Sequence, residues 1–322
     1  MMETKEFTYK KGNEGEDLLA DVHWKRGSPV TKTGQGHPIA LIFHGGGFVL
    51  GSKEIVPKPQ ISALTDLGFL VVVPNYRLCP QISAFDGPVS DSRDCLIWAV
   101  TELPGLLETN GVVDFRIDAT KVVTMGHSGG GGLALRMASF PEIPVPITAV
   151  LDFYSGKYYS DRSWHSPNPL YVNAPQTWPD DDYINRIYDV PQVSSADPYL
   201  DKETPPPPRD AWLTAQLKKG SWLAQVVKDV DFDRVDAAKG FSSTFPPTMF
   251  IHGNGDTFTE SRISERAHKE LKALGIETKL LLVPGAQHMF DMLLKEEDDL
   301  FQNYVLKGLK FLAEKAGLQN QE

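Results

Sequence analysis

The chain has 322 residues, of which 41% are hydrophobic and 23% charged, and its formal net charge is −10 at pH 7. This length can bury one large core with an inserted subdomain, and the acidic balance argues against nucleic acid and anionic membrane surfaces, which bind clustered lysine and arginine. No run approaches a membrane span, residues 1–18 lack the apolar stretch of a signal peptide, and the two cysteines cannot build a disulfide framework, so we expect a protein of the cytoplasm.

Predicted strands and helices alternate along the chain. Residues 7–10 and 18–24 indicate an antiparallel strand pair at the edge of a sheet. Short apolar runs typical of buried strands follow at 39–43, 70–73, 122–125, 147–153, 248–251 and 279–283. Helical patterns lie at 90–100, 129–139, 260–274 and 299–313. The alternation predicts an α/β protein with a mostly parallel eight-stranded sheet flanked by helices.

The segment 155–245 differs from the rest, because it is rich in proline, tyrosine and tryptophan and separates two strand signals. We interpret it as an inserted cap, so that 1–154 and 246–322 form the two parts of the core. Inside the cap, 212–227 is the best helical candidate, and the proline run 205–208 predicts a stiff surface connector. Most cap aromatics are expected to hold the cap together and a few to line a pocket, with Trp164, Trp178 and Trp212 as candidates.

Two glycine-rich corners follow two of the predicted strands. The sequence His44-Gly45-Gly46-Gly47 ends the run 39–43, and Gly126-His127-Ser128-Gly129-Gly130 ends the run 122–125. In the second corner, small residues on both sides of Ser128 allow a sharp strand-to-helix turn that exposes the hydroxyl. In the first corner, the missing Cβ atoms let backbone N–H groups approach a substrate oxygen. Together the corners indicate covalent acyl chemistry with Ser128 as the nucleophile.

A serine nucleophile needs a base, and the base needs an acid to orient it. Asp256 lies in a polar turn after the apolar run that ends at 251, and His288 follows the run 279–283. The order Ser128, Asp256, His288, each after a strand, is the order of α/β-hydrolase triads. His252 is the only rival base, and its position before the acid speaks against it.

The chain resembles the α/β-hydrolases and, among them, the hormone-sensitive-lipase-like esterases, which carry a His-Gly-Gly-Gly motif ahead of the nucleophile elbow. Residues 75–80, Asn-Tyr-Arg-Leu-Cys-Pro, match the Tyr-Arg-Leu-Ala-Pro stretch of that group with Cys79 in place of alanine. The resemblance implies that backbone N–H groups of Gly46, Gly47 and Gly129 form the oxyanion hole. One departure is His127, which stands where many members have an acidic residue beside the nucleophile.

The motifs predict a serine esterase that cleaves small-molecule esters through an acyl-enzyme, and the resemblance implies that it needs no cofactor. The same three residues also serve reactions on lactones, amides or formamides and acyl-carrier substrates, or cyclisation in a biosynthetic pathway, and a small-ligand receptor on the same fold is a further alternative. No histidine or cysteine pair has metal-ligand spacing, and the glycines at 126–132 lack the lysine of a phosphate loop. We therefore expect neither a metal nor a nucleotide.

Overall fold

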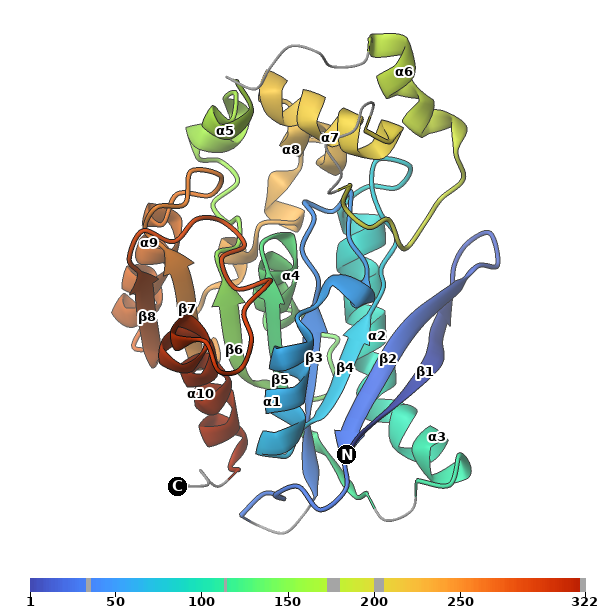
Figure 1. Ribbon diagram of the computed structural model, residues 1–322, viewed down its shortest axis with the longest axis vertical. Helices are drawn as coiled ribbons and strands as arrows, with labels where there is room; N and C mark the ends of the chain where they lie inside the picture. The colour runs from blue at the N-terminus through green and yellow to red at the C-terminus, as the bar shows by residue number, and fades with distance from the viewer. Residues whose placement is uncertain (33–35, 113–114, 173–179, 200–205, 319–322) are drawn as a thin grey trace.

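A computed structural model describes residues 1–322 except 33–35, 113–114, 173–179, 200–205 and 319–322. Its centre is an eight-stranded sheet in the order β1-β2-β4-β3-β5-β6-β7-β8 (Figure 1). The strands are β1 Met2–Lys11, β2 Asp17–Lys25, β3 His37–Phe43, β4 Leu70–Pro74, β5 Ile117–His127, β6 Ile147–Phe153, β7 Thr248–Gly253 and β8 Thr278–Val283. The pairs β1/β2 and β2/β4 are antiparallel and all other pairs are parallel, which confirms the predicted edge pair and the mostly parallel sheet.

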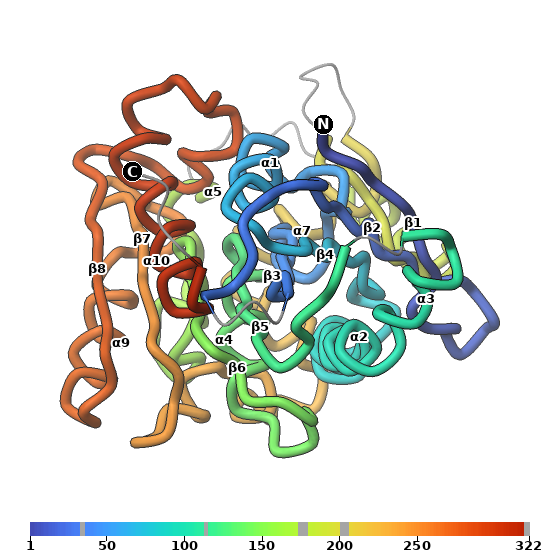
Figure 2. The backbone as a smooth tube through the Cα atoms, turned by 90° about the horizontal axis from the view of Figure 1, so that it is seen from below, coloured from blue at the N-terminus to red at the C-terminus, as the bar shows by residue number. Residues whose placement is uncertain are grey.

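Helices cover both faces of the sheet, which explains why its central strands are apolar on both sides. Every residue of β3 and of β4 is buried. Helices α1 and α10 pack on one face, and α2, α4 and α9 pack on the other (Figures 1 and 2). The helices are α1 Lys58–Leu67, α2 Ser90–Thr101, α3 Leu103–Thr109, α4 Gly129–Met137, α5 Pro169–Val172, α6 Asp181–Asn185, α7 Pro208–Lys219, α8 Trp222–Val227, α9 Arg262–Ala273 and α10 Leu306–Ala316.

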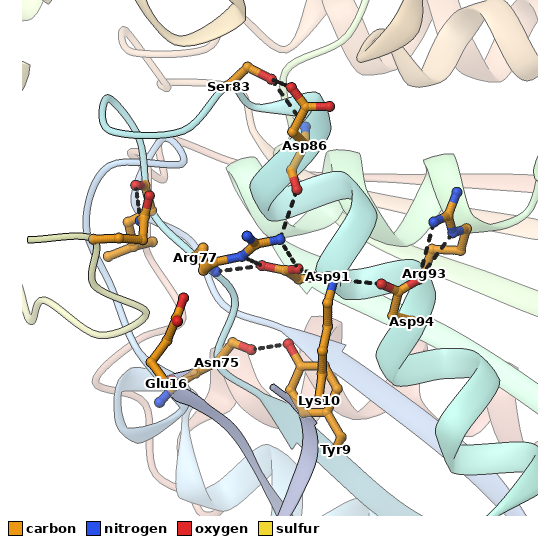
Figure 3. A network of polar contacts seen from close by, with 12 residues as sticks. Tyr9, Lys10, Glu16, Asn75, Arg77, Ser83, Asp86, Asp91, Arg93 and Asp94 are labelled. Atoms are coloured by element: carbon orange, nitrogen blue, oxygen red, sulfur yellow. Dashed lines mark hydrogen bonds and ion pairs between the residues drawn. The ribbon is translucent and has the colours of Figure 1, made fainter. Parts of the chain in front are cut away.

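The stretch after β4 is tied to the opening hairpin and to α2 by a buried polar network (Figure 3). The guanidinium of Arg77 donates two hydrogen bonds to the carboxylate of Asp91, at 2.8 and 2.7 Å. Lys10 donates to the same carboxylate at 2.7 Å, and the hydroxyl of Tyr9 donates to the carbonyl of Asn75 at 2.7 Å. A bidentate pair of this kind has strict geometry, so it fixes the path of the chain behind the glycine corner.

The chain between β6 and β7 carries α5, α6, α7 and α8, which lie beyond the carboxyl ends of the parallel strands (Figure 1). The predicted single helix over 212–227 is wrong, because Gly220 adopts a left-handed conformation with φ of 71° and separates α7 from α8. The connector prediction also fails at Pro208, which begins α7, since proline fits the first turn of a helix. Pro205 lies outside the described residues, and the division at 155 and 245 stays a prediction.

Within the described ranges, none of the helices has the length and apolar character needed to cross a membrane. Both cysteines, Cys79 and Cys95, are buried as free thiols. Burial raises the pKa of the Cys79 thiol to about 12, so this thiol stays protonated at neutral pH.

Candidate active site

Ser128 occupies a strained turn between β5 and α4. Its φ of 52° and ψ of −121° are unusual for a residue with a side chain. The neighbouring glycines make this turn possible, since a Cβ atom on Gly126 would lie 2.2 Å from the carbonyl oxygen of Gly130, and one on Gly130 would lie 2.1 Å from that of Phe43. Strain held by such packing is typical of functional turns and exposes the hydroxyl at the end of the strand.

The structure brings Ser128, His288 and Asp256 together from the ends of β5, β8 and β7. Nε2 of His288 lies 2.9 Å from Oγ of Ser128, and Nδ1 of His288 lies 2.7 Å from Oδ2 of Asp256. The second carboxylate oxygen of Asp256 accepts hydrogen bonds from the backbone N–H groups of Phe258 and Thr259, at 2.8 and 2.9 Å. The distances suit a serine, a base and an orienting acid.

Asp256 is held in its ionised form. Burial alone would raise the pKa of Asp256, but hydrogen bonds from His252 and His288 outweigh burial and hold the pKa well below its ordinary value. A carboxylate that stays ionised can stabilise a positive charge on the imidazole of His288. The site therefore has a fixed negative charge at the end of the hydrogen-bonded path.

The glycine corner supplies backbone N–H groups beside Ser128. Gly46 and Gly47 have φ values of 112° and 60°, and a Cβ atom on Gly46 would lie 2.1 Å from the carbonyl oxygen of Leu50. Over the described part of the chain, the N–H groups of Gly46, Gly47 and Gly129 donate no hydrogen bond. Nε1 of Trp222 in α8 donates to the carbonyl of Gly47 at 3.0 Å, so the inserted segment supports this corner directly. Free N–H groups at this place can receive an oxyanion.

His44 has a supporting position rather than a place beside the base. Its ring is buried and stacks on Tyr76 with ring centroids 4.1 Å apart, and its Nδ1 is 2.8 Å from the carbonyl oxygen of Gly45. The hydroxyl of Tyr76 donates to the backbone carbonyl of His44 at 2.8 Å. Burial lowers the pKa of His44 to about 4, so its neutral ring helps to fix the corner.

A cavity of about 290 Å³ opens onto Ser128 and His288. Apart from the site residues and the glycine corner, its walls are mainly apolar, and they include Leu50, Leu170, Tyr171, Leu213, Leu217 and Phe258. The inserted segment therefore contributes to the walls through α5 and α7.

Two of the predicted tryptophan candidates, Trp164 and Trp212, do not line this cavity. Trp212 is buried and its indole N–H donates to the hydroxyl of Tyr188, while Trp164 lines a smaller neighbouring cavity of about 50 Å³. Trp178 lies outside the described residues. Tyr171 is the aromatic of the inserted segment that faces the larger cavity, among the residues that the structure describes.

A buried polar cluster under the site was missed by sequence reasoning. Nε2 of His127, next to the nucleophile, lies 3.0 Å from Oε1 of Gln60 and 3.1 Å from Oδ2 of Asp291. Asp291 also accepts hydrogen bonds from Gln60 and from the hydroxyl of Tyr154. The ring of Tyr154 packs edge-on against His288 at 4.8 Å, so the cluster joins both sides of the site. The unusual His127 was the only signal in the sequence that pointed to this cluster.

His252, the rival base, lies behind Asp256 and does not contact Ser128. It is fully buried, and its Nε2 is 3.2 Å from Oδ2 of Asp256. Of the described residues, no group of three or more histidine, cysteine, aspartate or glutamate side chains could hold a metal ion.

Comparison with known proteins gives one family and two kinds of relatives. A family model described as alpha/beta hydrolase fold matches residues 40–161. A non-reducing polyketide synthase of Aspergillus calidoustus is 30% identical over 315 residues, which cover 86% of this chain and 13% of the synthase. One from Penicillium brasilianum is 32% identical over 342 residues, which cover 95% of this chain and 14% of the synthase. The chain thus spans about a seventh of the length of these curated relatives.

Solved structures share the fold over nearly the whole chain. A thermophilic esterase from the Planctomycetes species Thermogutta terrifontis has a TM-score of 0.64 at 18% identity and covers 99% of this chain and 94% of its own. A bacterial heroin esterase has a TM-score of 0.66 at 18% identity and covers 99% of this chain and 85% of its own. At this identity the likeness describes the fold alone.

Proposed function

We propose that this chain, which belongs to the alpha/beta hydrolases and within them to the group that resembles hormone-sensitive lipase, is a serine esterase that cleaves small-molecule esters. The proposal depends on one observation, the continuous path from Ser128 Oγ through His288 to Asp256, with contacts of 2.9 and 2.7 Å. Three free N–H groups and an apolar cavity lie at the serine end of this path in the described structure.

The reaction proceeds through an acyl-enzyme. Ser128 Oγ attacks the ester carbonyl while Nε2 of His288 takes the hydroxyl proton, and the carboxylate of Asp256 stabilises the resulting imidazolium. The N–H groups of Gly46, Gly47 and Gly129 donate to the carbonyl oxygen as it becomes negative. The imidazolium then returns its proton to the leaving alcohol, and a water molecule activated by the same histidine releases the acid.

The cavity favours a neutral, apolar acyl or ring group of modest size. Its volume of about 290 Å³ is at the lower end of ligand sites. Its walls have few polar groups beyond the reacting ones, so recognition depends on buried apolar area at about 25 cal/mol per Å². Discrimination between neighbouring acyl lengths is therefore expected to be graded, because one methylene changes binding only modestly.

The test is covalent labelling with a fluorophosphonate probe beside a screen of p-nitrophenyl esters. The unaltered chain should label and turn over short esters, and Ser128→Ala should do neither while keeping its thermal midpoint. Removing the nucleophile of such a triad costs about six orders of magnitude in kcat. Labelling of Ser128→Ala, or substantial turnover by it, would show that the nucleophile is another residue. A receptor on this fold would not label at all.

A second candidate reaction is the release of an acyl chain from a carrier thioester. The observation that favours it is the 30% identity to part of a polyketide synthase over 86% of this chain. Such a synthase builds acyl chains, and a triad that cleaves an oxygen ester can also cleave a thioester.

Matched substrates separate the two reactions. The oxygen ester and the N-acetylcysteamine thioester of one acyl group should be compared by kcat/KM. A thioester preference of tenfold or more favours carrier release, whereas equal or lower values favour the simple ester. Mass spectrometry of the product distinguishes hydrolysis from lactone formation or another cyclisation, and lactone and formamide substrates test the remaining alternatives.

A further inference from the structure

A buried chain of polar groups leads from Lys157 to Asp256. Nζ of Lys157 donates to the carbonyl of Ser155 at 2.8 Å and to Oγ of Ser264 at 3.2 Å, and it pairs with Asp152 at 2.9 Å. Lys157, Asp152 and Ser264 are fully buried. An ammonium group has three N–H donors and no acceptor, so Lys157 must be the donor in its contact with Ser264.

The same chain fixes the hydrogen of Ser264. Its Oγ receives a hydrogen from Lys157, so its own hydrogen is available to Nδ1 of His252, which lies 2.8 Å away. Nδ1 of His252 then acts as an acceptor. On the other side of the ring, Nε2 faces only acceptors, the carbonyl oxygen of Thr259 at 2.8 Å and Oδ2 of Asp256 at 3.2 Å. The hydrogen of the neutral ring must therefore be on Nε2.

This tautomer makes His252 a donor to the acid of the triad. Oδ2 of Asp256 receives a hydrogen bond from His288 and faces Nε2 of His252 at 3.2 Å, whose hydrogen is shared with the carbonyl of Thr259, while the other oxygen is held by two backbone N–H groups. With donors on every side, the carboxylate cannot rotate away from His288. Removing one donor would free part of the negative charge on Oδ2 and leave its position less defined.

We infer that His252 is a positioning residue for the proposed reaction, that its Nε2–H fixes Asp256, and that Ser264 and Lys157 select the tautomer that makes this donation possible. The inference depends on the proposed function, because it assigns Asp256 as the acid of the triad. His252 takes no proton from Ser128, since it lies on the far side of the acid. Among the described titratable side chains, Tyr154 packs against His252 and His288 is hydrogen-bonded to Asp256. Lys157 contacts His252 only through Ser264, and Asp152 pairs with Lys157.

The kinetic test compares two substitutions of His252. His252→Phe keeps an aromatic ring but removes both nitrogens, and kcat should fall roughly 10- to 100-fold, the range typical of a lost outer partner, with little change in KM. The acidic limb of the kcat/KM profile should move to higher pH by several tenths of a unit to about one unit. The limb moves to higher pH because a carboxylate with fewer hydrogen-bond donors stabilises the imidazolium of His288 more strongly.

A conservative variant and a matched control complete the kinetic test. In His252→Gln the side-chain amide can place an N–H where Nε2 lies, so both kcat and the pH limb should return toward those of the unaltered chain. His268→Gln removes a histidine that is hydrogen-bonded to Thr278 away from the site, and it should change neither value. The inference would be overturned if the acidic limb of His252→Phe lay at the same pH as that of the unaltered chain. It would also be overturned if His252→Gln lost as much kcat as His252→Phe.

A spectroscopic measurement tests the tautomer of His252 in the unaltered chain, so it does not depend on whether a variant folds. In the unaltered chain at pH about 8, above the ordinary titration range of histidine, 15N NMR should show His252 protonated on Nε2 and not on Nδ1. The opposite tautomer would refute the assigned hydrogen-bond chain. If Ser128→Ala keeps its activity, the proposed function fails. If Ser128→Ala is inactive but the His252 results are negative, only this inference fails.

Discussion

Replacing Asp291 by asparagine should destabilise the fold around the site. Asp291 is 1% exposed and accepts hydrogen bonds from Gln60 at 2.6 Å and from the hydroxyl of Tyr154, and it lies 3.1 Å from Nε2 of His127. Its partners come from α1, from the end of β6 and from the turn of the nucleophile, so one carboxylate joins three separate parts of the chain. The asparagine side chain would keep the shape but lose the charge and one strong acceptor.

The expected loss is about 2–3 kcal/mol. Leaving a buried donor without its acceptor costs about 1–3 kcal/mol, and more where the lost acceptor was charged, while the asparagine carbonyl still accepts a hydrogen bond from one of the other donors. For a chain of this size, about 2 °C of thermal midpoint corresponds to each kcal/mol. The midpoint of Asp291→Asn should therefore fall by roughly 4–6 °C at neutral pH.

The destabilisation should depend on pH in one direction. Burial alone would raise the pKa of Asp291, but the electrostatic interaction with His127 and the hydrogen bonds from His127, Tyr154 and Gln60 outweigh burial and lower the pKa. A carboxyl whose pKa is lower in the folded state stabilises the fold above its unfolded value of about 3.9. That stabilisation is lost as pH falls from this value through the folded pKa. The difference between the two chains should then shrink on acidification below about pH 4.

The assay is differential scanning fluorimetry of both chains from neutral to acidic pH, with Asp299→Asn as the control. Asp299 is exposed on the same stretch, and its substitution should leave the midpoint unchanged. A midpoint within about 1 °C of the unaltered chain at neutral pH, or a larger difference at low pH than at neutral pH, would refute the assigned role of Asp291.

Three further predictions concern the turn, the cavity and the base. Gly130→Ala should abolish activity and lower the thermal midpoint, because its Cβ would lie 2.1 Å from a backbone carbonyl oxygen. The control Gly105→Ala, whose Cβ would have nothing within 4 Å, should behave as the unaltered chain. Equal effects of the two substitutions would show that the clash at Gly130 is not the cause. Leu213→Trp should lower kcat/KM for bulky esters more than for acetate, and an unchanged ratio would show that α7 does not limit the cavity. On acidification kcat/KM should fall as the base takes up a proton. No second step is expected in the usual aspartate range, because the pKa of Asp256 is held below that range. A flat profile would contradict His288 as the base.

The sequence predicts the sheet and the site geometry well where the signals are local. Apolar runs mark the buried strands, and glycines at fixed spacing around Ser128 mark a turn that only residues without Cβ allow. Each of the predicted reacting residues follows a strand, and parallel strands bring their carboxyl ends to one edge. That topology explains why Ser128, Asp256 and His288 meet.

Other features could not be predicted because they depend on contacts between distant parts of the chain. Gln60 and Asp291 are 231 positions apart, and no local pattern connects them. The inserted segment has weak periodicity, so its helix boundaries depend on tertiary packing and on the left-handed Gly220. The role of Trp222 under the glycine corner is likewise visible only in three dimensions.

The histidine beside the nucleophile departs from the family pattern and has a buried acidic partner in this chain. Many members of the group that this chain resembles have an acidic residue at the position of His127. Here the position is a histidine, and its ring lies 3.1 Å from the buried carboxylate of Asp291, three residues after His288. An acidic side chain at 127 would place two carboxylates within hydrogen-bond distance, which is unfavourable unless one is protonated. With histidine at 127, Asp291 has a hydrogen-bonding partner between the two loops, while Ser128 and Asp256 keep their contacts with His288. The polar support beneath the site thus differs from the family pattern, although the three proposed reacting residues follow it.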